Sequence, residues 1–183
     1  MWLSSFFSLF IFTGLVASVF YFGKKTPGYS HIRHTISELG QMDAPHKLKV
    51  NYRVFLPTAV ALIAIALIIW ITENRFTPYA LLAGSVGTGY LIAAFFPADP
   101  GSPMWGSMRQ QIHNAGGAVQ YLGGAASLII LSKNSLLLEP FYLTSAYILL
   151  IAAAGISLPF LKSIRGFIQR IAELVLSANL ILT

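Results

Sequence analysis

The chain has 183 residues, of which 56% are hydrophobic and only 10% are charged. Because a soluble domain carries about 25% charged residues, this composition excludes a surface that faces only water and indicates a protein embedded in lipid. The sequence has no cysteine, which excludes disulfides, thiolate metal sites and thiol catalysis. Its net charge of +6 agrees with the basic cytoplasmic loops of membrane proteins. No basic run alternates with exposed aromatic residues, so we expect no nucleic-acid partner.

Six apolar stretches are long enough to cross a bilayer, because about 20 residues span its hydrocarbon core. We expect these spans at residues 2–22, 54–72, 78–96, 111–131, 141–161 and 167–182. The first stretch could be a signal peptide, but it lacks a basic start and a clean cleavage motif. The sequence therefore predicts an all-α fold, a polytopic membrane protein in which residues 1–183 form one domain of six transmembrane helices.

The connection after the first span holds the densest polar segment. Ser30 can cap a short helix that ends at Gly40, and such a helix would carry His31, His34 and Glu38 on one face. It is too short to span, so we predict an interfacial helix.

Small residues recur at three- and four-residue spacing in the third and fourth spans, which predicts that these two helices pack closely. The first, third and fifth connections hold six, one and two Lys or Arg residues, whereas the second and fourth hold one each. We therefore place the odd connections in the cytoplasm and both termini outside, in the inner (plasma) membrane. This topology puts three polar segments on one side: residues 29–40, residues 96–101 with His113, and residues 165–173.

One interpretation of these segments is a metal site. Imidazole and carboxylate groups together suit zinc, which would activate a bound water as a nucleophile. The candidate ligands are His31, His34, Asp99 and His113. The alternative is that the two histidines of the first segment face head groups and water, and that Asp99 caps its own turn.

A second interpretation is a ligand site. Guanidinium groups bind phosphate or carboxylate well, and a polar helix face that carries His113 and Gln120 would point into the bundle. The candidate ligand-binding residues are Glu38, Gln120, Arg165, Arg170 and Glu173. Arg170 and Glu173 could instead form a structural i, i+3 pair, and Gln120 could join helices through hydrogen bonds.

Catalysis would draw on three residues of these segments. Ser37 is a candidate nucleophile with a nearby histidine as its base, and Asp99 and His113 are the other candidate catalytic residues.

Short motifs in the same segments resemble the domain-of-unknown-function 998 family over nearly the whole chain. They are Ile-Ser-Glu-Leu-Gly at 36–40, Phe-Pro-Ala-Asp-Pro-Gly at 96–101, the histidine at 113, and Arg165-Gly166 followed by Gln169-Arg170. The resemblance implies a small integral membrane protein of bacteria or archaea and implies no particular activity.

A looser likeness links Ser37, Asp99 and His113 to the ceramidase-like membrane hydrolases, which gather Ser, Asp and His residues around an intramembrane zinc. The chain departs from them because no histidine follows His113. Two functions therefore stay open at this point: a hydrolase of a lipid amide or ester, and a receptor or accessory subunit that binds a membrane lipid or small anion. A carrier is less favoured, because no span is broken at its centre, and the sequence leaves the oligomeric state open.

Overall fold

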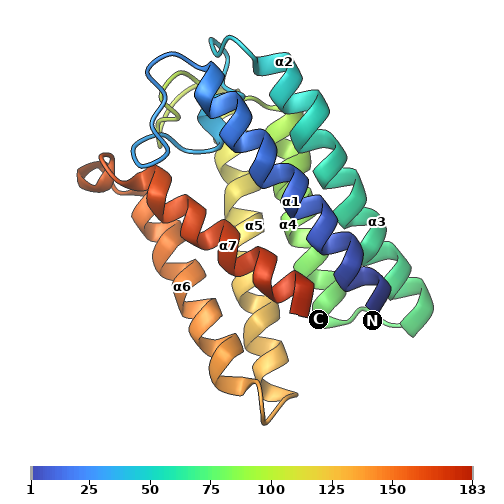
Figure 1. The fold of residues 1–183 in the computed structure, drawn as a ribbon. Coiled ribbons are helices and arrows are strands. Elements are labelled where there is room, and N and C mark those ends of the chain that lie inside the picture. The colour runs from blue at the N-terminus through green and yellow to red at the C-terminus, as the bar shows by residue number, and fades with distance from the viewer. Residues whose placement is uncertain (1, 183) are drawn as a thin grey trace.

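The computed structural model describes residues 2–182, which fold into a bundle of long helices with no strand in that range (Figure 1). Short 3-10 turns lie at Ser37–Leu39 and Pro159–Leu161, and a π-helical turn lies at Asn51–Phe55. The α-helices are α1 (Trp2–Lys25), α2 (Lys47–Val50), α3 (Leu56–Glu73), α4 (Pro78–Phe95), α5 (Met108–Lys133), α6 (Glu139–Ser157) and α7 (Arg165–Leu182).

Within the described residues, five helical segments are long and apolar enough to cross a membrane. They are Ser5–Lys25, Lys47–Glu73, Pro78–Phe95, Met108–Lys133 and Glu139–Ser157. The chain is thus a multi-pass membrane protein, but the sixth predicted span, α7, is not among the five. Its first half carries Arg165, Arg170 and Glu173, which lower its mean hydropathy. Even so, α7 packs against α6 and α1 as part of the bundle.

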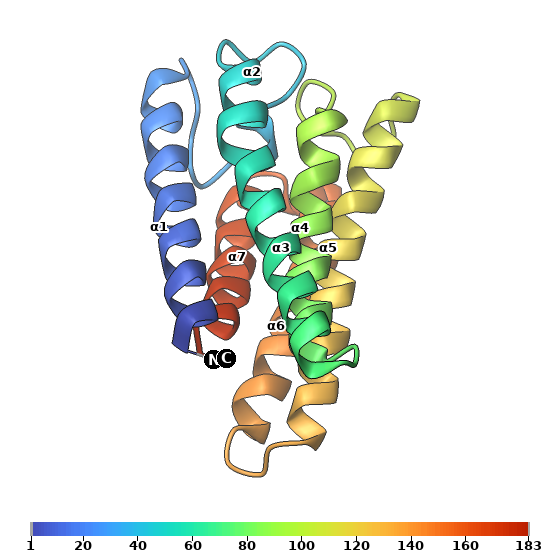
Figure 2. The same ribbon diagram turned by 90° about the vertical axis from the view of Figure 1, so that its right-hand side faces the viewer.

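The second span begins earlier than the sequence predicts. α2, the π-helical turn and α3 form one continuous helical segment, Lys47–Glu73, which runs obliquely from one end of the bundle to the other in Figure 2. The side-chain amide of Asn51 donates to the carbonyl oxygen of Gly40 at 2.9 Å. This bond anchors the π-helical turn to the loop that precedes it.

The predicted close pair of helices is present, because α4 packs most extensively against α5. A Cβ on Gly89 would collide with Gln120, and a Cβ on Gly116 would collide with Ile92. The small residues therefore let the two backbones approach, as the spacing predicts. A buried core of aliphatic and aromatic side chains surrounds this contact.

The predicted helix from Ser30 to Gly40 is wrong, because the segment forms a turn at 31–34 and a single 3-10 turn at Ser37–Leu39. Some of its backbone groups bond to α7. The carbonyl oxygen of Ile32 accepts from the Phe167 amide at 2.9 Å, and the Ile36 amide donates to Gln169 Oε1 at 2.6 Å. The segment keeps one i to i+4 bond, from the His34 amide to the Ser30 carbonyl oxygen at 2.8 Å, and the bonds to α7 satisfy other backbone groups that a helix would pair internally.

Candidate functional site

Three polar segments that lie far apart in the sequence meet at one end of the bundle. The guanidinium of Arg165, at the start of α7, donates to the Glu38 carboxylate at 2.8 Å. It also donates to the carbonyl oxygens of Gly101 at 2.6 Å and Ser102 at 3.2 Å. In Figure 1, the loops at 26–46 and 97–107 lie together at the end where α7 begins. One arginine therefore ties all three segments together.

The ion pair between Glu38 and Arg165 is buried, with side-chain exposures of 6% and 8%. Glu38 Oε1 also accepts from the Thr35 amide at 2.7 Å and from the Thr35 hydroxyl at 3.1 Å. These bonds all reach Oε1 and offset part of the cost of burying the carboxylate. Glu38 and Arg165, both predicted as ligand-binding residues, thus use Oε1 and the two Nη groups to hold the fold of this end.

Arg170 binds the first polar segment rather than Glu173. Its Nη1 donates to the carbonyl oxygen of His34 at 3.0 Å, and its Nη2 donates to the Tyr29 hydroxyl at 2.7 Å. Nη2 also contacts His31 Nδ1 at 2.9 Å. The predicted i, i+3 pair between Arg170 and Glu173 is therefore absent, and these contacts occupy the guanidinium of Arg170.

These contacts change the acidity of two side chains in the loop. Burial raises the pKa of Tyr29 to about 12, although the charge of Arg170 opposes that rise. Burial lowers the pKa of His31 below its usual value, and the charge of Arg170 lowers it further. Arg170 is a permanent donor, so its bond to His31 Nδ1 requires that nitrogen to be unprotonated. The neutral imidazole is thus the form that fits this loop.

Gly166, one residue after Arg165, lets α7 approach the loop. A Cβ at this position would collide with the backbone of His34, which cannot move aside as a flexible side chain could. The motif Arg165-Gly166 is therefore explained by the docking of the loop against α7.

Glu173 lies in the interior of the bundle, between α4, α5 and α7. Its carboxylate accepts from the Tyr90 hydroxyl at 2.8 Å, from Gln120 Nε2 at 2.7 Å and from the Tyr121 hydroxyl at 2.8 Å. Glu173 and Gln120 were both predicted to bind ligand, but here they bind one another. The two tyrosines were not predicted as partners, although a carboxylate in an apolar helix indicates that hydrogen-bond donors must lie on neighbouring helices.

The structure does not bring the predicted metal ligands together. No group of three or more His, Asp or Glu side chains among residues 2–182 is placed to hold a metal ion. His31 contacts Arg170, and the Nδ1 of His34 accepts from the Ser30 amide at 2.9 Å. The reason is the missing helix at 30–40, because the histidine face that the prediction requires exists only in a helix.

Asp99, predicted as a catalytic and metal-binding residue, is held by its own loop. Its carboxylate accepts from the Ser107 amide at 2.8 Å and from the Ser107 hydroxyl at 2.9 Å, and it pairs with Arg109. The Ser107 amide and the Arg109 guanidinium hold the pKa of this carboxyl below its usual range. The Asp99 carboxylate thus holds the start of α5 rather than capping its own turn, as the alternative interpretation had it.

A groove of about 720 Å³ runs from this polar end along α5 and α6. We call it the α5–α6 groove. Its polar lining includes Thr35, Ser37, Ser102, Gln111, His113, Asn114, Ser157, Lys162, Arg165 and Gln169. Its apolar lining includes Ala118, Leu122, Leu150, Ala153, Ala154 and Ile156. The groove is therefore amphiphilic, with residues from all three polar segments in its wall.

Two of the predicted catalytic residues, Ser37 and His113, line the α5–α6 groove. His113 Nδ1 lies 2.9 Å from the carbonyl oxygen of Phe96. Because a carbonyl oxygen only accepts, Nδ1 must carry the proton, which leaves Nε2 of the neutral ring as an acceptor. His113 can therefore accept a proton from a group in the groove.

Residues 9–183 match the family described as protein of unknown function (DUF998). No curated protein and no solved structure shows significant similarity to the chain.

Proposed function

Because the chain belongs to the DUF998 family, whose description assigns no activity, we propose its function from its own site: the α5–α6 groove binds a membrane amphiphile that has an anionic head group and an acyl chain. The observation that carries this proposal is the amphiphilic lining of the groove. Its volume also falls in the range of about 300–1,000 Å³ that is typical of small-molecule sites.

The head group would meet Lys162 at the polar end. Lys162 is exposed and lines the groove, and it forms no ion pair with the carboxylates of residues 2–182. The charges of Arg165 and Arg170, in contrast, are engaged by Glu38 and by the loop at 29–34. We therefore assign the binding of the anionic head group to Lys162 rather than to the two arginines. His113 and Gln111 would form hydrogen bonds to the same head group.

The acyl chain would lie against the apolar wall. Leu122 and Ala154 line the groove and are exposed, so this wall is open at the side that a bilayer would cover. An acyl chain placed there buries apolar surface on both partners.

This proposal includes a membrane topology. α7 has 18 residues and would extend about 27 Å at about 1.5 Å per residue, so we propose that it forms a sixth, less apolar crossing. The excess of Lys and Arg in the odd connections favours a cytoplasmic position for the polar end, with both termini outside a prokaryotic plasma membrane.

The experiment for binding compares two tryptophan substitutions. Ala154→Trp fills the groove, whereas Ala126→Trp places the same side chain on an exposed position of α5 outside the groove lining. The probes are oleoyl lysophosphatidic acid and its uncharged counterpart, monoolein, added to the purified protein and detected by native mass spectrometry. We expect Ala154→Trp to reduce binding of the anionic probe about tenfold or more, and Ala126→Trp to leave it unchanged. Equal binding by both variants would contradict the proposal.

A second substitution tests the head-group contact. Lys162→Gln removes the proposed cation, and Lys133→Gln removes an exposed cation at the other end of α5. We expect Lys162→Gln to weaken binding of the anionic probe and to leave binding of monoolein unchanged, because only the charged head group contacts the ammonium group. Equal effects of the two substitutions would show that net charge alone governs binding.

Hydrolysis of a lipid ester or amide is the second candidate function, because Ser37 and His113 line the same groove. The Ser37 hydroxyl would add to the acyl carbonyl as His113 Nε2 takes its proton, and that proton would pass to the leaving alcohol or amine. Water would then release the carboxylic acid. A fluorophosphonate probe should label Ser37, and both Ser37→Ala and His113→Gln should abolish the label. Binding without labelling would leave the protein a binder rather than a hydrolase.

A further inference from the structure

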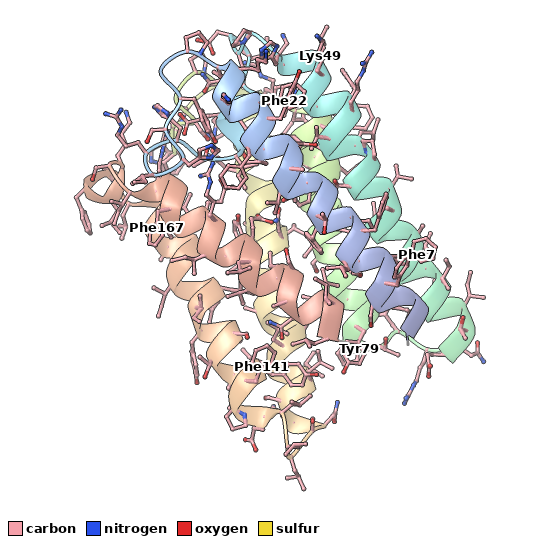
Figure 3. The ribbon with its side chains drawn as sticks, in the orientation of Figure 1. Phe7, Phe22, Lys49, Tyr79, Phe141 and Phe167 are labelled. Carbon is pink, nitrogen blue, oxygen red and sulfur yellow. The ribbon has the colours of Figure 1, made fainter. Side chains whose placement is uncertain are left out.

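A second recess lies on the other side of the polar end, between the end of α1 and the start of the Lys47–Glu73 segment. It has a volume of about 430 Å³ and is lined by Tyr21, Phe22, Lys25, His46, Lys49 and Arg53. We call it the basic recess. It shares no lining residue with the α5–α6 groove. Figure 3 places the labelled Phe22 and Lys49 near one another, on α1 and α2.

The positive charge of the basic recess is not neutralised within residues 2–182. Lys25, Lys49 and Arg53 line it, and no carboxylate does. The two ion pairs among residues 2–182 join Asp99 to Arg109 and Glu38 to Arg165, and none of these four residues lines the recess. Three cations around one small volume repel each other, so an anion from outside the chain would stabilise them.

Aromatic rings form the remaining wall. The ring of Phe22 lies 5.6 Å from that of His46, and the ring of Tyr21 lies 5.1 Å from that of Phe22. Lys25 Nζ lies 6.0 Å from the centre of the Tyr21 ring. The recess adjoins the ends of two apolar segments, where aromatic rings and cations together are typical of the head-group level of a bilayer.

Local structure positions the backbone that carries two of the cations. Arg53 belongs to the π-helical turn Asn51–Phe55, and Lys49 precedes it. The bond from Asn51 to the Gly40 carbonyl oxygen holds this turn against the loop. π-helical turns of this kind are frequent at functional sites. The recess is thus held by a buried contact, although its cationic side chains are exposed.

We propose that the basic recess binds the phosphate of an anionic glycerophospholipid from the surrounding leaflet. The acyl chains lie along exposed apolar side chains of α1 and α3, such as Phe10 and Val60, which share the helix faces of Lys25 and Arg53. Basic pockets between membrane helices bind phospholipid head groups by this chemistry. The proposal does not depend on the α5–α6 groove, because a different set of residues carries it.

The test uses native mass spectrometry of the full chain with phosphatidylglycerol or phosphatidylcholine. The recess variant is K25Q/K49Q/R53Q. The matched control is K24Q/R33Q/K47Q, which removes three cations from the same connection and none from the lining. Cations near an anionic head group strengthen its binding, so we expect the recess variant to bind phosphatidylglycerol at least about tenfold more weakly. The control should stay within about twofold of the natural chain.

Two further measurements separate the alternatives. K25R/K49R replaces both lysines but keeps their positive charges, and it should retain binding. Retained binding would show that the charges, rather than the lysine side chains as such, are needed. Inorganic phosphate at equal concentration should not displace the lipid, because it lacks the acyl chains; displacement would overturn the assignment to a phospholipid. Equal losses in the recess and control variants would also overturn it, since general surface charge would then explain binding.

Discussion

Glu38→Gln tests whether the buried ion pair joins the loop at 29–40 to α7. The substitution keeps the size of the side chain and one oxygen that can accept from Thr35, but it removes the negative charge. Arg165 would then keep only neutral partners, the carbonyl oxygens of Gly101 and Ser102. We expect the polar end of the bundle to lose stability and the loop to detach from α7.

The magnitude follows from the burial of the pair. Both side chains are less than 10% exposed, and removal of one partner of a buried pair costs about 3–5 kcal/mol. Because glutamine still accepts a hydrogen bond, we expect the lower end, about 3 kcal/mol. At about 1.4 kcal/mol per tenfold change, the ratio of folded to unfolded protein falls by about two orders of magnitude.

The assay is equilibrium unfolding in mixed micelles, with Asp43→Asn as the control. Asp43 is exposed in the same connection and forms no ion pair within the described residues, so its substitution should change the free energy of unfolding by less than about 0.5 kcal/mol. The double variant Glu38→Gln with Arg165→Met should lose less stability than the sum of the single variants. An effect of Glu38→Gln no larger than that of Asp43→Asn would refute the reasoning.

Three further predictions concern the contacts of α7. The pKa of His31 is lower in the folded chain than its usual value of 6.5. The stability that this group contributes is therefore complete above about pH 6.5 and is lost as the pH falls through the folded pKa. His31→Asn should flatten that part of the plot of unfolding free energy against pH. Gly166→Ala should destabilise the chain by about 1–3 kcal/mol or more in the same assay, since its Cβ meets the His34 backbone, whereas Gly14→Ala, with open space around it, should not. Glu173→Ala leaves three buried donors without an acceptor, at about 1–3 kcal/mol each, and Glu173→Gln should lose measurably less; equal losses would contradict the bonding described for this carboxylate.

The sequence predicted the helices because their signals are local. A run of apolar residues must satisfy its own backbone groups in lipid, and a helix does so wherever the rest of the chain lies. The glycines of α4 and α5 are also local signals, and they predicted the close pair correctly. The charges of α7 are a local signal as well, because Arg165, Arg170 and Glu173 keep this helix outside the five segments that are long and apolar enough to cross a membrane.

The partners of the polar residues could not be predicted in this way. Glu38 and Arg165 lie 127 positions apart, and Arg170 has an equally plausible neighbour in Glu173 at i+3. The partner that Arg170 binds depends on how α7 packs against the loop, and the i, i+3 spacing within the helix does not specify that packing. The same long-range bonds explain why residues 30–40 form turns rather than the predicted helix.

The sequence by itself determined that the protein lies in a membrane, where most helices run and which segments are polar. It also indicated that these segments lie on one side, because the number of crossings between them fixes the side. Only the tertiary structure decided that Arg165 joins them, that Glu173 binds two tyrosines and Gln120, and that an amphiphilic groove passes Ser37 and His113. The physical reason is that apolar burial in lipid is set by composition along the chain, whereas each polar contact needs two groups within about 3 Å in space.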